Sequence, residues 1–179
     1  MHTPVLIVPG IHNSGESHWQ TLWQRGNPGF ERLQVEDWDH PECGHWCDAI
    51  ERAVKRLGPR TMIVAHSLGC LAVAHWAARP GSAVGTVDAA LLVALPDPEG
   101  PAFPPEALGF APLPEVRLPF RSIIVASGDD PYANPDLTDR CAHGWGSRVH
   151  HAGNHGHLNA ASGLEDWAAG RALFESLQT

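Results

Sequence analysis

The chain has 179 residues, of which 43% are hydrophobic and 18% charged, and its 20 acidic and 12 basic side chains give a net charge of −8 with histidine neutral. A chain of this length buries a sizeable core without disulfides or a metal, so the composition excludes a disordered protein and favours one domain spanning residues 1–179. The acidic balance argues against a nucleic-acid or anionic-membrane partner, because Lys and Arg form no cluster. We therefore expect a small-molecule partner.

The N-terminal segment MHTPVLIVPG is typical of a first strand and not of a secretory signal, because it has no cationic region and only a short apolar run. Without such a signal, the four cysteines are expected to be reduced thiols and the protein to be cytoplasmic. No stretch reaches the roughly 18 consecutive apolar residues that a membrane helix needs. We therefore expect no association with a membrane.

Short apolar runs alternate with helical patterns along the whole chain. The runs predicted to be strands are Pro4–Val8, Phe30–Val35, Arg60–Ala65, Val87–Leu95, Arg121–Ala126 and Arg148–His151. This alternation predicts an α/β fold with a parallel sheet that helices cover on both faces. Ligands of such sheets bind beyond the C-terminal ends of the strands, so the loops after the strands should contain the functional residues.

Five helices are predicted between and after these strands. A capping box, Ser17-x-x-Gln20, starts the first, and the second ends at Gly58. The third is expected from Leu68 to about Arg79, and the fourth starts at Asn134 with a proline in its first turn. A second capping box, Ser162-x-x-Glu165, is predicted to start the last helix.

The segment from Pro96 to Pro119 is rich in proline, with seven prolines before Pro119 itself. Proline lacks a backbone N–H and fixes φ, so this segment forms neither a helix nor a central strand. We expect an ordered loop or lid here.

The strongest motif is Ala65-His66-Ser67-Leu68-Gly69, which follows an apolar strand and precedes a helical run. This arrangement is typical of the nucleophile elbow, G-x-S-x-G, in which small residues on either side of the serine keep strand and helix from colliding. Alanine replaces the first glycine of the common form. We expect Ser67 to be a nucleophile, with the Leu68 N–H placed to stabilise an oxyanion.

A serine nucleophile needs a base and a group that orients the base, and in elbow folds the chain order is serine, acid, histidine. Asp129 and Asp130 follow the fifth strand, and His155 and His157 follow the sixth. We favour Asp130, because the next residue is a rigid proline, and His157, because an apolar leucine follows to anchor it.

The loop after the first strand is expected to supply the second oxyanion donor, the Ile11 N–H, since Gly10 lets the backbone approach a substrate closely. The pocket itself is predicted from five side chains. They are His12, Asn13, His66, Phe103 and Phe110.

A second cluster, His40, Cys43, His45 and Cys47, superficially suggests a metal site. Zinc sites draw paired ligands from separate segments, whereas this cluster overlaps the start of an amphipathic helix. We therefore predict no metal, and the lack of a G-x-G-x-x-G or Walker A motif predicts no nucleotide cofactor.

Motifs along nearly the full length give the chain a family resemblance. They are Pro9-Gly10 with Ser14, His18-Trp19, Asp37-Trp38 with Pro41 and Trp46, AHSLGC, Leu118-Pro119-Phe120, ASGDDPYA, GHLN, Ser162-Gly163 and Trp167. In these the chain resembles the small serine hydrolases of the α/β-hydrolase superfamily that include retinoblastoma-binding protein nine and the bacterial YdeN-type proteins. The resemblance implies a compact fold without a large cap, six strands in the order 2-1-3-4-5-6, and a triad of Ser67, Asp130 and His157.

Together these observations predict a serine hydrolase of esterase type that cleaves small esters through an acyl-enzyme on Ser67. Two alternatives stay open. The same triad could cleave amide or peptide bonds, or the fold could serve as a non-catalytic module that binds a protein or a small ligand.

Overall fold

A computed structural model describes residues 3–178, so residues 1–2 and 179 of the predicted domain lie outside the described part. Its centre is a parallel six-stranded sheet in the order β2-β1-β3-β4-β5-β6. The strands are β1 (Val5–Val8), β2 (Phe30–Arg32), β3 (Thr61–His66), β4 (Val87–Val93), β5 (Arg121–Ala126) and β6 (Arg148–His151). The predicted fold class and strand order are confirmed.

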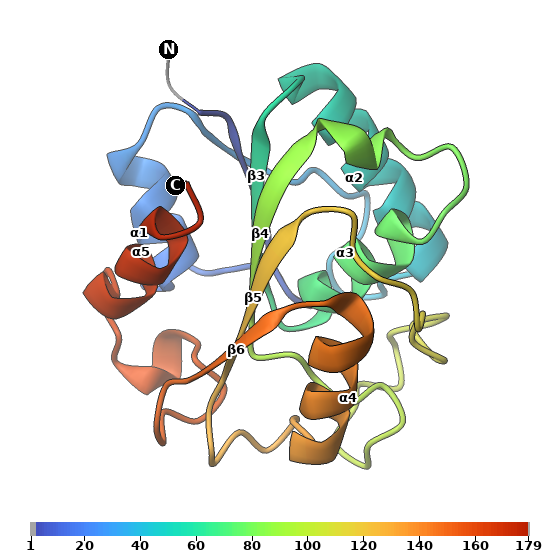
Figure 1. The fold of residues 1–179 in the computed structure, drawn as a ribbon. Coiled ribbons are helices and arrows are strands. Elements are labelled where there is room, and N and C mark those ends of the chain that lie inside the picture. The colour runs from blue at the N-terminus through green and yellow to red at the C-terminus, as the bar shows by residue number, and fades with distance from the viewer. Residues whose placement is uncertain (1–2, 179) are drawn as a thin grey trace.

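Helices cover both faces of this sheet (Figure 1). On one face lie α1 (Trp19–Gly26) and α5 (Ala168–Glu175), and on the other α2 (Cys43–Leu57), α3 (Leu68–Ala77) and α4 (Pro135–Trp145). Short 3₁₀ turns, η1 (Ala83–Thr86) and η2 (Ala160–Ser162), complete the described elements.

The two faces of the sheet have separate apolar cores. In β3, Met62 and Val64 pack into the core beneath α1 and α5, while Ile63 and Ala65 pack into the core beneath α2 and α3. Because successive strand residues point to opposite faces, burial on both sides requires a continuous apolar strand. This explains why the central strands were recognisable in the sequence as short apolar runs, whereas the edge strands β2 and β6 are only partly buried.

Strand β2 is half as long as predicted and ends at Arg32 instead of Val35. It is an edge strand whose one neighbour, β1, offers it only Val5, Leu6 and Ile7 as partners. Strand β4 also ends early, at Val93, because Ala94 takes a φ of 57° and turns the chain away from the sheet.

Both predicted capping boxes are wrong. Helix α1 has His18 as its N-cap, and the Gln20 side chain points inward, where its Nε2 donates to the carbonyls of Val8 and Val64. Ser162 instead serves a capping box on Asn159 in η2, so α5 begins only at Ala168. The predicted cap of α4 is confirmed, since the Asn134 side chain accepts from the Leu137 N–H.

The proline-rich segment 96–119 contains no helix or strand, as predicted. One isolated bridge joins Leu108 to Glu42 at the start of α2. Within residues 3–178 there is no helix with both the length and the apolar character needed to cross a bilayer.

Candidate active site

Ser67 lies at the sharp turn between β3 and α3, with a φ of 54° and a ψ of −125°. A backbone in this region is strained for any residue with a side chain, and here the fold holds it by packing α3 close to the end of β1. A Cβ on Gly69 would lie 2.6 Å from the Pro9 carbonyl oxygen and closer still to that of Val8. Only glycine therefore fits two residues after the serine, which accounts for the motif physically.

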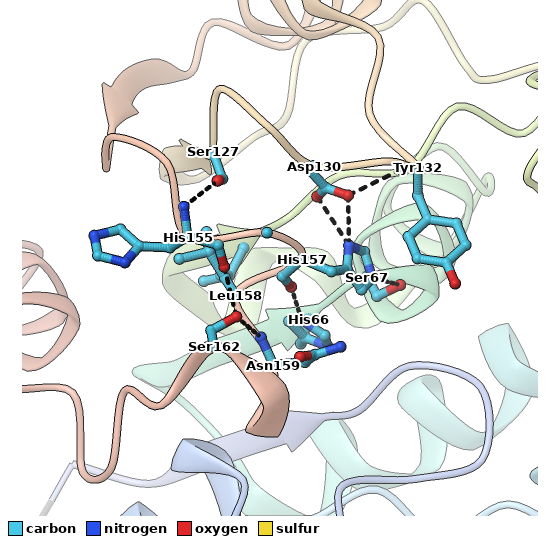
Figure 2. A network of polar contacts seen from close by, with 12 residues as sticks. His66, Ser67, Ser127, Asp130, Tyr132, His155, His157, Leu158, Asn159 and Ser162 are labelled. Atoms are coloured by element: carbon cyan, nitrogen blue, oxygen red, sulfur yellow. Dashed lines mark hydrogen bonds and ion pairs between the residues drawn. The ribbon is translucent and has the colours of Figure 1, made fainter.

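A continuous hydrogen-bonded chain joins Ser67, His157 and Asp130 (Figure 2). The Ser67 Oγ lies 2.7 Å from the His157 Nε2, and both Asp130 carboxylate oxygens lie within 2.9 Å of the His157 Nδ1. The Asp130 side chain is fully buried and also accepts from the Tyr132 N–H. Such a chain can withdraw the serine proton and stabilise the resulting imidazolium.

His155, the alternative base, has an exposed ring that points away from Ser67 in Figure 2. Its backbone N–H donates to the Ser127 Oγ, and that hydroxyl donates in turn to the Asp129 carboxylate. The same carboxylate accepts from the Gly156 N–H. The hydrogen bond from Gly156 and, to a smaller extent, the one from the Ser127 hydroxyl lower the pKa of Asp129. Asp129 is exposed, as expected, but it also fastens the loop after β5 to the loop that carries His157.

Two backbone N–H groups near Ser67 have no hydrogen-bond partner among residues 3–178. The Ile11 N–H forms no hydrogen bond within residues 3–178, and the Leu68 N–H lies in the first turn of α3, ahead of the intrahelical ladder. Gly10 permits this close approach, because a Cβ there would lie 3.0 Å from the Ser67 Cβ. These N–H groups could stabilise negative charge on an oxygen bound beside Ser67.

Ser67 opens into a cavity of about 260 Å³. Four of the predicted pocket residues line it, and the full lining set is Gly10, Ile11, His12, Asn13, His18, His66, Ser67, Leu68, Pro96, Phe103, Pro104, Tyr132, His157 and Asn159. Phe110 does not line the cavity and was wrongly predicted. Its ring is buried in the core between the rings of Trp46, His75 and Phe103.

Sequence reasoning missed several lining residues, and the signal available for each differs. Tyr132 and Asn159 each come two residues after a predicted site residue, and the Tyr132 ring centroid lies 4.6 Å from that of His157. His18 lies far from the other motifs in sequence and was noted only as part of the pair His18-Trp19. Its position in the pocket depends on where the start of α1 packs, which no local pattern shows.

The polar side of the cavity holds two buried histidines in addition to His157. Burial, together with the nearby Arg32 charge and His157, lowers the pKa of His18 to about 4. Burial also lowers the pKa of His66 well below its ordinary value. Both rings are therefore uncharged near neutral pH.

Two side chains from other elements donate hydrogen bonds to the loop that carries His157. The His66 Nε2 donates to the His157 carbonyl at 2.9 Å, and the Trp19 Nε1 donates to the Leu158 carbonyl at 2.8 Å. The Trp19 ring also contacts those of Trp23 and Trp167. The base is thus supported from α1 and β3 as well as from its own loop.

The histidines and cysteines of residues 40–47 do not converge. Cys43 and Cys47 are buried against the core, whereas His40 and His45 are exposed and lie beside the carboxylates of Asp37 and Glu42. In the described part of the chain, no group of three or more His, Cys, Asp or Glu side chains is placed to hold a metal ion. All four cysteines are free thiols.

Comparison with known proteins places these features in a family context. A family profile described as serine hydrolase matches residues 5–176. No curated protein sequence matches the chain.

Solved structures share the fold over the whole length. A YdeN-like hydrolase from Pectobacterium atrosepticum is 25% identical, with a TM-score of 0.83 over 98% of this chain and 90% of the other. The ydeN gene product of Bacillus subtilis is 18% identical, with a TM-score of 0.72 over 99% of both chains. A monoacylglycerol lipase from Paleococcus ferrophilus is 15% identical, with a TM-score of 0.67 over 99% of this chain and 96% of the other.

Proposed function

Because this chain belongs to the serine hydrolase family, we propose that it cleaves small carboxylic esters through an acyl-enzyme on Ser67. Ser67 is the nucleophile, His157 the general base and acid, and Asp130 the carboxylate that fixes the imidazole tautomer and stabilises its cation. The Ile11 and Leu68 N–H groups form the oxyanion hole. The partner is a small-molecule ester.

In the first half of the proposed reaction, the Ser67 Oγ attacks the ester carbonyl while its proton passes to the His157 Nε2. The carbonyl oxygen becomes an oxyanion held by the two N–H groups. The intermediate then collapses, the C–O bond to the alcohol breaks, and His157 returns the proton to the departing oxygen. The alcohol leaves and the acyl group stays on Ser67.

Water completes the cycle in the second half. His157 takes a proton from the water as its oxygen attacks the acyl carbonyl, and the same N–H groups hold the new oxyanion. The bond to the Ser67 Oγ breaks, the serine recovers its proton from His157, and the carboxylic acid is released.

The observation that carries this proposal is the unbroken hydrogen-bonded chain from the buried Asp130 through His157 to Ser67, at the floor of a cavity. A cavity of about 260 Å³ lies just below the usual range of ligand-pocket volumes, about 300–1,000 Å³, which favours a short ester over an extended peptide. Every step uses this chain's own side chains and backbone.

Labelling with a fluorophosphonate, measured by intact mass, tests the proposal. The folded protein should gain one adduct, on the peptide that contains Ser67, and Ser67→Ala should gain none. Turnover of a short ester should disappear in the same variant and persist in the presence of EDTA. A folded protein that takes up no adduct would favour the non-catalytic binding module.

A further inference from the structure

Three side chains on the polar side of the cavity have hydrogen-bonding atoms that the proposed mechanism does not use. They are His18, His66 and Asn159. Each commits one polar atom to a backbone group, and that bond determines whether the remaining atom is a donor or an acceptor. We call these three side chains the polar wall of the cavity. Which of their free atoms donate and which accept follows from the backbone groups that they bind.

His18 presents a donor. Its Nδ1 accepts from the Gln20 N–H as the N-cap of α1, so the neutral ring carries its proton on Nε2. The side chain is buried, with 5% of the residue exposed, and Nε2 has no hydrogen-bond partner within the described residues. A buried donor left without a partner costs free energy, so a bound group that accepts from it is stabilised.

His66 presents an acceptor. Its Nε2 lies 2.9 Å from the His157 carbonyl oxygen, which can only accept, so Nε2 carries the proton. Nδ1 is then unprotonated, and it forms no hydrogen bond within residues 3–178. The His66 ring packs edge-on against the His18 ring with a centroid separation of 4.8 Å, so this acceptor and the His18 donor belong to one wall.

Asn159 presents a second donor. Its Oδ1 accepts from the Ala161 N–H, which settles the orientation of the amide and leaves Nδ2 as the free end. No acceptor in the described part of the chain takes either Nδ2 proton. The residue follows His157 by two positions, and both line the cavity. Figure 2 labels both residues.

From this combination we infer that the natural substrate carries a hydroxyl group close to its scissile ester bond, bound by His18, His66 and Asn159. This inference rests on the proposed function and specifies its substrate class. A hydroxyl donates one hydrogen bond and accepts others through a single oxygen, so it can donate to the His66 Nδ1 and accept from the His18 Nε2–H or the Asn159 Nδ2–H.

Charged groups match this wall less well. A carboxylate only accepts and would face the lone pair of the His66 Nδ1, whereas an ammonium only donates and would face the N–H groups of His18 and Asn159. Both histidines are uncharged near neutral pH, so the wall offers no counter-charge of its own. A neutral group that both donates and accepts fits it best.

Matched ester pairs test the inference and show which side of the ester carries the hydroxyl. Ethyl 3-hydroxypropanoate and ethyl butanoate differ by one hydroxyl for one methyl in the acyl chain, and 2-hydroxyethyl acetate and propyl acetate differ likewise in the alcohol. In at least one pair, kcat/KM of the wild type should be about tenfold higher for the hydroxylated ester, as expected for one buried hydrogen bond.

Two variants shorten the side chain while keeping a cap, so that the N–H or O–H that remains no longer reaches the position of the His18 Nε2 or the Asn159 Nδ2. His18→Asn retains an oxygen that can accept from the Gln20 N–H, and Asn159→Ser retains one for the Ala161 N–H. Each variant should reduce the preference for the hydroxylated ester several-fold. If His18→Asn does not fold, Asn159→Ser alone carries the test. His155→Asn, which changes an exposed ring on the same loop, should retain the full preference.

Equal kcat/KM within both pairs, or a preference that survives in both variants, would overturn the inference. Fluorophosphonate labelling of the same preparation separates this failure from failure of the proposed function. A protein that labels on Ser67 and hydrolyses the esters without preference is an esterase that does not recognise a hydroxyl. A protein that neither labels nor hydrolyses any of the four esters overturns both proposals.

Discussion

Asp129 and Asp130 are adjacent in sequence but bind different groups, which makes them a matched pair for mutation. Both oxygens of Asp130 lie against the His157 Nδ1. Replacing this carboxylate by an amide keeps its shape but favours the wrong imidazole tautomer, an effect on the order of 10⁴ in kcat in the serine-protease precedent. Asp130→Asn should therefore lose about four orders of magnitude in kcat on an activated ester.

Asp129→Asn should lose far less, about tenfold, because its carboxylate fastens the His157 loop through Gly156 and Ser127 without touching the imidazole. Circular dichroism of both variants serves as the folding control. Equal losses would mean that both carboxylates act on the base, and a larger loss in Asp129→Asn would transfer the orienting role to Asp129.

At the scale of single residues, the sequence predicted most where a motif carries its own geometry. Ser67 and the small residue two positions after it, Gly69, follow from the strand-turn-helix context. Chain order predicts a histidine after the sixth strand, where the leucine after His157 favoured that residue over His155. Phe110 and His18 could not be placed this way. Whether Phe110 faces the cavity or the core depends on how the proline-rich segment folds back, and the position of His18 depends on the docking of α1.

The close packing of α3 against β1 leads to a prediction about two glycines in helices. Gly69→Ala would put a methyl group against the carbonyls of Val8 and Pro9, and overpacking of this kind costs about 1–3 kcal/mol. Gly44→Ala, on an exposed position of α2 with nothing closer than 3.8 Å, should instead stabilise by about 0.5–1 kcal/mol. Urea unfolding followed by circular dichroism measures both.

An unchanged stability in Gly69→Ala would show that α3 can move away from β1 at no cost. In that case the turn at Ser67 would not be held by this contact. Loss of ester turnover in Gly69→Ala beyond the loss of folded protein would support the link between helix packing and the position of the Ser67 Oγ.

The segment 96–119 forms part of the cavity wall through Pro96, Phe103 and Pro104, and this limits the length of the acyl chain. A chain that outgrows the cavity leaves methylenes in water and forgoes about 0.8 kcal/mol for each of them. Across p-nitrophenyl esters, kcat/KM should therefore peak at a short acyl chain and then level off or fall. A continuous rise to long acyl chains would contradict a closed wall at this segment.

At the scale of elements, periodicity predicted the sheet and its helices well, because strands buried on both faces have an unmistakable apolar pattern. The element ends were predicted less well. Helix α1 is capped by His18 and α5 follows Trp167 in a left-handed conformation, neither of which is a common capping residue. Contacts elsewhere in the fold determine these ends. The Gln20 side chain donates to carbonyls of β1 and β3, and the Ser162 hydroxyl accepts from the Asn159 N–H at the start of η2.

For the molecule as a whole, buried neutral histidines make the free energy of unfolding depend on pH in the acid range. The pKa of His18 is lowered from its ordinary 6.5 to about 4, so between these pH values the unfolded chain binds a proton that the folded protein excludes. The free energy of unfolding therefore falls as pH falls through this range, by about 3 kcal/mol at pH 4 for His18 alone. His66 acts in the same direction.

Urea unfolding between pH 7 and pH 4 measures this loss, and His18→Asn isolates the contribution of one ring. The variant should lose stability less steeply than the wild type, because asparagine does not titrate in this range. Parallel pH profiles for the two proteins would show that His18 is protonated in the folded state and that its burial does not exclude the proton.

The hydrogen bond from the Trp19 indole to the Leu158 carbonyl supplies the protein with an optical reporter next to its base. Because Trp19 packs against Trp23 and Trp167, its emission and its near-ultraviolet dichroism depend on contacts between α1 and the C-terminal segment. Detachment of the loop that carries His157 would expose this indole and shift its fluorescence to longer wavelength. An inactive chain whose helices remain intact can thus be recognised by its fluorescence, before any substrate is added.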